Sequence, residues 1–241
     1  MRKLAIFTEG QTEVLFVVEL VREVAGRRNV AVQHVEARGG RKSVRTFRTV
    51  NAASTTGDEK YFVLVCDCGT DNRVASDVHE QYPSLSKSYD GILAIRDVFP
   101  KTRSDVCTIA RAMRYGLRTK PIETQLVLAI MEIEAWILGE VTHFERLDSG
   151  LSPALVTATL DFDPSTGTLE DRHNPARDLN DAYGAVGRTW DKSRAVVEAT
   201  LGALDFAEVY LTCAARMPSL KRLTDHLDFF FSGGSWRSDA A

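Results

Sequence analysis

The sequence predicts an α/β protein with a mostly parallel β-sheet flanked by helices, followed by a helical extension at the C-terminus. Short apolar segments of strand length alternate with helix-like segments up to residue 131. Such alternation is typical of βα units, whose parallel strands carry helices on both faces. After residue 131 the strand signals stop and the pattern becomes helical. We therefore expect an α/β core at 1–131 and a helical extension or cap at 132–241.

Five apolar segments of the core predict strands. They are KLAIF at 3–7, NVAVQHVEA at 29–37, YFVLVCD at 61–67, GILAIRD at 91–97 and QLVLAIM at 125–131. Helix-like segments lie at 12–25, 74–85 and 106–113. Val44, Phe47 and Val50 share the three-residue spacing of a helix, so a short helix is predicted there too. The tail after Phe231 is expected to be frayed, as chain ends often are.

The composition points to an ordinary globular protein, with 44% apolar and 26% charged residues. A net charge of −3 gives no overall field that would attract nucleic acid or a membrane, so such binding would need local patches. No apolar run approaches the roughly 18 residues of a membrane span. The N-terminus has no signal-peptide layout, and the 4 cysteines have no disulfide-framework spacing. These features predict a cytoplasmic protein with reduced thiols and no membrane partner.

Acidic residues follow most of the predicted strands. Glu9, Asp67 and Asp97 end the first, third and fourth strands, and the fifth runs into Glu132 and Glu134. A single acid at a strand end is often a helix cap. Several acids on the same edge of a parallel sheet would repel one another unless a cation held them. Carboxylate oxygens suit Mg²⁺ or Mn²⁺, so the sequence predicts such an ion at this edge.

The stretch TEGQTE at 8–13, with the apolar helix behind it, resembles the first motif of the TOPRIM (topoisomerase-primase) fold. Its form is similar to that of the OLD-family and RloB-like nucleases of bacterial defence loci. Two later segments, EIEAWILG at 132–139 and the stretch from His173 to Lys192, resemble further parts of small TOPRIM-like proteins. The resemblance implies that Glu9 is a metal ligand or general base. It also implies that Asp67 and Asp97 occupy the places of the later acidic motifs.

The paired Asp-x-Asp acids of that family are not intact in this chain. Asp67 is followed by Cys68 and Gly69, and Asp97 is followed by Val98 and Phe99. Either Asp71 or Glu134 supplies a missing ligand, or a single ion binds, or the protein is a degenerate member that does not cleave. The predicted catalytic residues are Glu9, Asp67 and Asp97. The predicted metal ligands are Glu9, Asp67, Asp97, Glu13, Asp71 and Glu134.

Two segments are rich in basic residues. Residues 38–48 contain five basic residues and no acid, and residues 96–120 contain seven basic residues and two acids. A solvated surface is the plain interpretation, and a surface that follows the phosphates of a nucleic acid is the alternative. The predicted nucleic-acid contacts are Arg41, Lys42, Arg45, Arg96 and Lys192.

The functional hypothesis is a Mg²⁺- or Mn²⁺-dependent TOPRIM-like nuclease that hydrolyses phosphodiester bonds in DNA or RNA. The resemblance places it in antiphage defence. One alternative is a non-catalytic module that binds nucleic acid or a partner ATPase, and another is a phosphatase or phosphotransferase for a small substrate. The chain has no Walker loop, so any ATPase would be a separate subunit. The sequence does not choose between DNA and RNA and does not predict an oligomeric state.

Overall fold

The computed structural model describes residues 1–40 and 43–238, with the side chain of Asp71 excepted. By their contacts, the residues form two compact units. The first unit contains Met1–Arg96, Cys107–Leu128 and Leu223–Ala241, and the second contains Asp97–Val106 and Ala129–Arg222. The chain leaves the first unit at Asp97, returns to it at Cys107, leaves it again at Ala129 and returns at Leu223. Each unit is described by itself.

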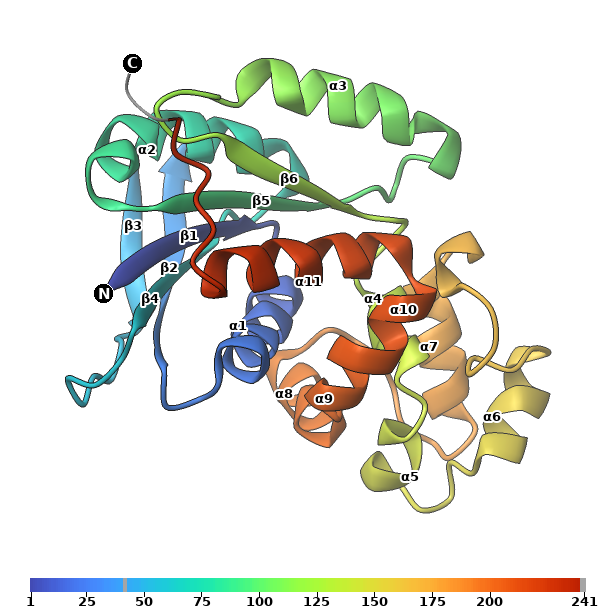
Figure 1. The fold of residues 1–241 in the computed structure, drawn as a ribbon. Helices are drawn as coiled ribbons and strands as arrows, with labels where there is room; N and C mark the ends of the chain where they lie inside the picture. The colour runs from blue at the N-terminus through green and yellow to red at the C-terminus, as the bar shows by residue number, and fades with distance from the viewer. Residues whose placement is uncertain (41–42, 239–241) are drawn as a thin grey trace. The chain divides into compact units, whose positions relative to one another are not determined.

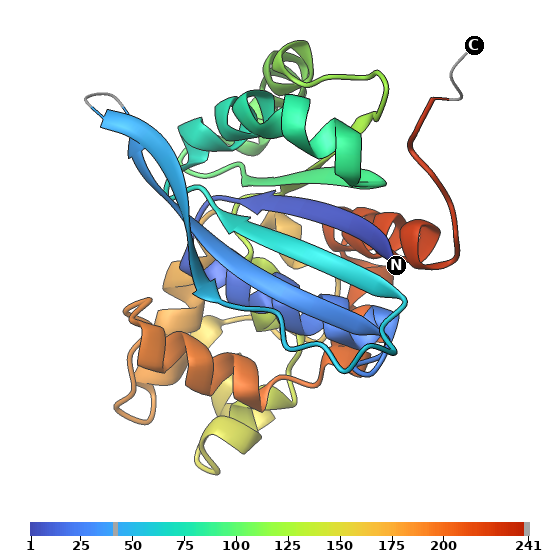
Figure 2. The ribbon, with the colours of Figure 1, turned by 90° about the vertical axis from the view of Figure 1, so that its left-hand side faces the viewer.

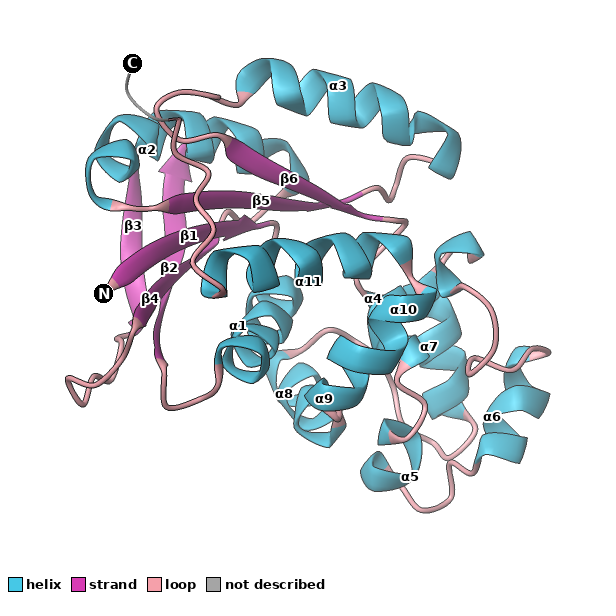
Figure 3. Ribbon diagram, in the orientation of Figure 1, coloured by secondary structure: helices cyan, strands magenta, loops and turns pink. Residues whose placement is uncertain are grey.

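The first unit is built on a six-stranded sheet (Figures 1 and 3). Its strands are β1 (Arg2–Thr8), β2 (Val30–Gly40), β3 (Ser43–Asn51), β4 (Tyr61–Asp67), β5 (Gly91–Asp97) and β6 (Thr124–Ala129). The order across the sheet is β3-β2-β4-β1-β5-β6. β1 runs parallel to β4 and β5, and β2 runs parallel to β4. The predicted α/β architecture with a mostly parallel sheet is therefore confirmed.

Central β1 carries an uninterrupted apolar run because both of its faces are covered. Its residues Leu4–Phe7 are fully buried. The helices of this unit are α1 (Gln11–Ala25), α2 (Val74–Ser88), α3 (Val106–Gly116) and the C-terminal part of α11 (Pro218–Phe231). Figure 2 shows α2 and α3 on one face of the sheet and α1 on the other. This two-sided arrangement follows from the βα alternation of the sequence.

The helix predicted around Val44, Phe47 and Val50 is wrong, because these residues belong to strand β3. β3 pairs antiparallel with β2, with Ala37 opposite Phe47. Apolar residues at three-residue spacing fit a helix, but β-branched and aromatic residues also favour a strand. Here β2 extends to Gly40 and offers β3 a partner, so tertiary pairing decides the local structure.

The predicted fraying after Phe231 is also wrong as far as residue 238. Arg2 donates from Nη1 to the Phe230 carbonyl at 2.6 Å and from Nη2 to the Gly234 carbonyl. A Cβ at Gly91 would meet the Trp236 ring at 2.8 Å. Ser238 N donates to the Pro121 carbonyl at 2.9 Å. The C-terminal segment is therefore part of the packing around the sheet.

Regular structure in residues 130–222 is helical throughout (Figure 3). Its α-helices are α4 (Glu134–Gly139), α5 (His143–Leu147), α6 (Pro153–Leu160), α7 (Pro175–Gly184), α8 (Arg194–Ala203), α9 (Phe206–Glu208), α10 (Ala214–Arg216) and the start of α11. Trp136 on α4 is fully buried, and its Nε1 donates to Ser219 Oγ at 3.1 Å. None of the helices among the described residues has the length and apolar character needed to cross a membrane.

Candidate functional site

Glu9 lies at the edge of the sheet where β1 ends. The parallel register places Thr8 opposite Asp67 on β4, and it places Asp67 opposite Glu36 on β2. Cys68 N donates to the Thr8 carbonyl at 3.0 Å, so the hydrogen bonding between the two segments continues one residue past the end of β4. Glu9 is therefore one residue beyond a row that carries two carboxylates. We call Glu9, Glu36 and Asp67 the edge acids.

An arginine balances the charge of Glu9. Arg96 on β5 places its Nε 3.8 Å from Glu9 Oε1, and the two side chains are 16% and 14% exposed. At this separation the pair is electrostatic rather than a close hydrogen bond. A guanidinium beside a carboxylate at a sheet edge can hold a phosphate next to a cation-binding group.

Glu13 lies in the first turn of α1, directly behind this edge. It is 8% exposed, and a Cβ added to Gly10 would lie 3.3 Å from its Oε2. The Glu13 carboxylate thus lies against the backbone at the start of the helix. The positive end of the helix dipole favours a negative charge there. Part of the role of Glu13 is therefore to stabilise α1.

Asp67 is held in a tight turn. Its Oδ1 accepts a hydrogen bond from Gly69 N at 2.8 Å. Burial raises the pKa of Asp67, and the nearby Glu36 carboxylate raises it further, while the Gly69 hydrogen bond opposes them. Gly69 has a φ of +77°, a conformation that favours glycine. An acidic residue at position 69 would therefore have to adopt a strained left-handed conformation.

Arg45, predicted as a nucleic-acid contact, is held inside the first unit. Its Nε donates to Asp77 Oδ1 at 3.0 Å, and its Nη2 donates to the Cys68 carbonyl at 2.7 Å. Its side chain is 11% exposed and that of Asp77 is fully buried. Arg73 adds a contact with Asp77 at 3.1 Å. Arg45 therefore connects β3 to α2 and to the loop after β4.

Other predicted residues lie elsewhere or outside the description. Arg41 and Lys42 lie outside the described residues, as does the side chain of Asp71. Asp97 is the last residue of β5, is 7% exposed and belongs to the second unit. The chain after Asp97 continues beside segment 129–131, since Phe99 N donates to the Met131 carbonyl at 2.7 Å.

The second unit holds a separate group of charges, which we call the buried glutamates. Glu134 is fully buried, and its Oε1 accepts from Lys192 Nζ at 2.7 Å and from Trp190 Nε1 at 3.2 Å. Glu132 is 5% exposed, lies 3.6 Å from the same Nζ and accepts from Ala176 N at 3.2 Å. Burial raises the pKa of Glu132, and the Glu134 carboxylate raises it further. Lys192 therefore compensates the charge of two neighbouring acids.

The backbone around the buried glutamates is strained. Met131 has a φ of 64° and Lys192 has a φ of 57°, although neither is glycine. Such left-handed residues persist only where the surrounding structure fixes them. Trp190 N donates to Asn180 Oδ1 at 2.9 Å, which anchors the segment that carries Lys192. The turn thus directs the ammonium group towards the two carboxylates.

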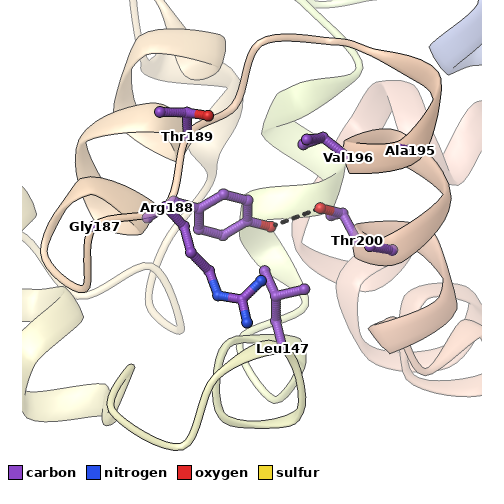
Figure 4. A pocket seen from close by; sticks show the side chains of 9 residues that line it. Leu147, Gly187, Arg188, Thr189, Ala195, Val196 and Thr200 are labelled. Atoms are coloured by element: carbon purple, nitrogen blue, oxygen red, sulfur yellow. Dashed lines mark hydrogen bonds between the residues drawn. The ribbon is translucent and has the colours of Figure 1, made fainter.

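A pocket of about 270 Å³ lies between α7 and α8 in the second unit (Figure 4). It is lined by Leu147, Tyr183, Gly187, Arg188, Thr189, Ala195, Val196, Ala199 and Thr200. Arg188 Nε donates to Asp148 Oδ2 at 2.9 Å, and the Tyr183 hydroxyl lies 3.4 Å from Thr200 Oγ1. The lining contains no acid, histidine or cysteine that could act on a substrate.

Behind the pocket, His143 is fully buried and neutral. Its Nδ1 lies beside the Glu140 carbonyl, which can only accept, so Nδ1 carries the proton. Its Nε2 then accepts from the Tyr183 hydroxyl at 3.0 Å. Burial lowers the pKa of His143 to about 4. These bonds position Tyr183 and make His143 a structural residue.

In the part of the chain that the structure describes, no three His, Cys, Asp or Glu side chains form a group that could hold a metal ion. The edge acids fit a hard cation in their chemistry, because their ligand atoms are carboxylate oxygens. The remaining ligands of such an ion would be water and substrate phosphates. The buried glutamates fit a cation less well, because Lys192 already supplies the positive charge.

The sequence did not single out Glu36 or Trp190. Glu36 lies inside a strand, and only the register with β4 brings it to Asp67. Trp190 precedes Lys192 in a loop, and its contact with Glu134 spans 56 positions of the chain. The alternation of NVAVQHVEA was a usable signal for the face of Glu36, whereas no local signal marked Trp190.

The chain was compared with protein-family models, curated proteins and solved structures, and none of them matches it.

Proposed function

We propose that this chain is a TOPRIM-like nuclease that depends on Mg²⁺ or Mn²⁺ and acts at the carboxyl edge of β1 and β4. The register of these strands carries the proposal, because it brings Glu9 next to the Thr8–Asp67 row at an edge where parallel sheets bind ligands. Arg96 lies 3.8 Å from Glu9 and supplies a group for a phosphate. The TEGQTE motif supports the same assignment through its resemblance to the TOPRIM first motif.

Glu9 and Asp67 would hold the ion, with Glu13 and Glu36 adding negative charge around it. When bound, the ion would polarise the scissile phosphate and lower the pKa of the attacking water. Arg96 would orient a phosphate oxygen and balance charge as the phosphate approaches Glu9. The antiphage setting, the contribution of Asp97 and a separate ATPase partner belong to the same proposal and rest on the resemblance alone.

The test is cleavage of labelled single-stranded DNA, duplex DNA and tRNA with Mg²⁺, Mn²⁺ or EDTA. The key variant is Glu9→Gln, which keeps the size of the side chain and removes its charge. We expect at least about a 100-fold loss of cleavage, as for removal of a group that acts on the reacting atoms. Because Glu9 is partly exposed, the thermal midpoint should stay close to that of the wild type.

Glu23→Gln is the matched control, since Glu23 lies on α1, is partly exposed and is remote from the edge in sequence. Full activity of the Glu9 variant would remove the proposed role of Glu9. Unfolding of that variant would assign Glu9 a structural role. Wild-type protein that binds nucleic acid without cutting it would favour the non-catalytic module, and hydrolysis of only a small phosphate ester would favour a phosphatase.

A further inference from the structure

Helix α3 has one face packed on the sheet and one face exposed. Ile109 and Met113 on the helix and Leu117 directly after it are buried, at spacings of four residues. Arg111, Arg114 and Tyr115 are exposed and lie three and four positions apart. At 3.6 residues per turn, these two sets lie on opposite sides of the helix. Figure 1 shows α3 as an outer helix of the first unit.

The outer face of α3 is basic without compensation. Segment 106–122 contains Arg111, Arg114, Arg118 and Lys120 and no acidic residue. All four are exposed, and none of them forms an ion pair within residues 1–40 and 43–238. Some arginines elsewhere are paired, as Arg22 is with Glu19 and Arg73 is with Asp77. A field from unpaired arginines on one face attracts a polyanion.

Tyr115 lies among these arginines and is 96% exposed, more than any other large apolar residue in the described part of the chain. Water solvates the apolar face of an exposed aromatic ring poorly, and this face offers a flat surface on which a base can stack. Bases of a single strand can stack on it, whereas duplex bases keep their faces covered. Arginine and tyrosine side chains next to each other on a helix can therefore pair with the phosphates and stack with an unpaired base of the same strand.

We infer that the face formed by Arg111, Arg114, Tyr115 and Arg118 binds single-stranded nucleic acid. The inference rests on the proposed nucleic-acid substrate and adds the surface and the strandedness. The arginines neutralise phosphates and Tyr115 stacks with a base, so binding depends strongly on salt and weakly on sequence.

The test is fluorescence anisotropy of a labelled oligothymidine of about 20 nucleotides, in EDTA so that metal-dependent cleavage does not interfere. The double variant Arg111→Ser/Arg114→Ser should bind at least about tenfold more weakly. It should also lower the log–log salt slope by about 0.7 for each phosphate that is no longer neutralised. Arg27→Ser/Arg28→Ser removes the same charge from another exposed site and should bind within about twofold of the wild type.

Tyr115→Ala should weaken binding by at least about fivefold, whereas Tyr115→Phe keeps the ring and should bind like the wild type. Cys107 supplies a local probe, because it is exposed one helical turn before Arg111 while the other cysteines are buried. Bound oligothymidine should slow the alkylation of Cys107. Equal affinities of the α3 double variant and the wild type would overturn the inference. Equal losses in the Arg27/Arg28 control would also overturn it.

The inference and the proposed function fail separately. Binding that depends on α3 without any cleavage by the wild type would reject only the nuclease. Cleavage that depends on Glu9, with oligothymidine affinity independent of α3, would reject only this surface. Tighter binding of duplex DNA than of the single strand, with no effect of Tyr115→Ala, would also reject it.

Discussion

The sheet edge of the first unit and the buried glutamates of the second unit hold their acidic residues in different ways. At the sheet edge, Glu9 remains partly exposed and faces Arg96 at 3.8 Å. In the helical unit, Glu134 is fully buried and bound to Lys192 at 2.7 Å. The first arrangement leaves carboxylate oxygens within reach of water, ions and substrate. The second buries the carboxylate completely and places a lysine ammonium group against it.

This difference shows that acids with similar positions in the sequence can differ in burial and in partners. Glu134 was predicted as a metal ligand and Lys192 as a nucleic-acid contact. In the structure each has the other as a partner, and Trp190 completes the group. A buried charge needs such a partner because leaving water is costly. Burial and partners, rather than residue type, distinguish the two kinds of site.

The largest effect is expected at Asp77, a fully buried acid in the unit that also carries the edge acids. It tests whether a buried acid depends on its counter-charge for stability. Arg45→Ala should lower the free energy of unfolding by about 3 kcal/mol, since the buried Asp77 would lose its least exposed cation and keep only the more exposed Arg73 as a counter-charge. Urea denaturation measures this change. Arg48→Ala, an exposed position on the same strand, should change stability by less than about 0.5 kcal/mol. A stable Arg45→Ala variant with weakened nucleic-acid binding would support the predicted nucleic-acid contact of Arg45.

Lys192 gives the next largest effect. Lys192→Met keeps a long side chain at the same strained φ and leaves Glu134 without its cation. Because Lys192 is 44% exposed and partly screened by solvent, we expect a loss of about 2 kcal/mol. The double variant Lys192→Met/Glu134→Gln should recover at least about half of that loss, as a double-mutant cycle would show. Additive losses would mean that the ion pair contributes nothing to stability.

The sequence predicted the core of the fold because its signals there are local. Apolar runs and helical spacing fixed β1, β4, β5 and their helices within a few residues. The exceptions depend on distant partners. β3 is a strand because β2 extends beside it, and the C-terminal segment is ordered because Arg2 and Gly91 pack against it. Neither partner is visible from the periodicity of the segment itself.

The candidate site could be predicted only to the level of strand ends. Glu9 and Asp67 follow apolar strands, so their meeting at one edge follows from parallel pairing. The partners of Arg45 and Lys192 could not be predicted, because these two ion pairs join residues far apart in the sequence. Arg45 and its partner Asp77 are 32 positions apart in the sequence, and Lys192 and Glu134 are farther apart. Opposite charges at such separations have too many possible partners for the sequence to decide.

The smallest effect concerns Glu132, whose pKa is raised by burial and by Glu134. A raised pKa in the folded state means that the native protein holds this proton more tightly than the unfolded chain does. Its contribution to stability is therefore full below the ordinary value of 4.5 and is lost as the pH rises through the folded pKa. Because glutamine does not ionise, Glu132→Gln avoids this loss of stability at high pH. Its side-chain oxygen still accepts the hydrogen bond from Ala176 N. We expect this variant to be more stable than the wild type at pH 8, by about 1 kcal/mol or less, and equal to it near pH 4.

Urea denaturation at several pH values measures the difference, with exposed Glu145→Gln on α5 as the control. If Glu132→Gln instead became less stable than the wild type as the pH rises, the attraction of Lys192 would exceed the cost of burial. Glu132 would then be a stabilising ion pair, and the contrast with the edge acids would rest on Glu134 alone.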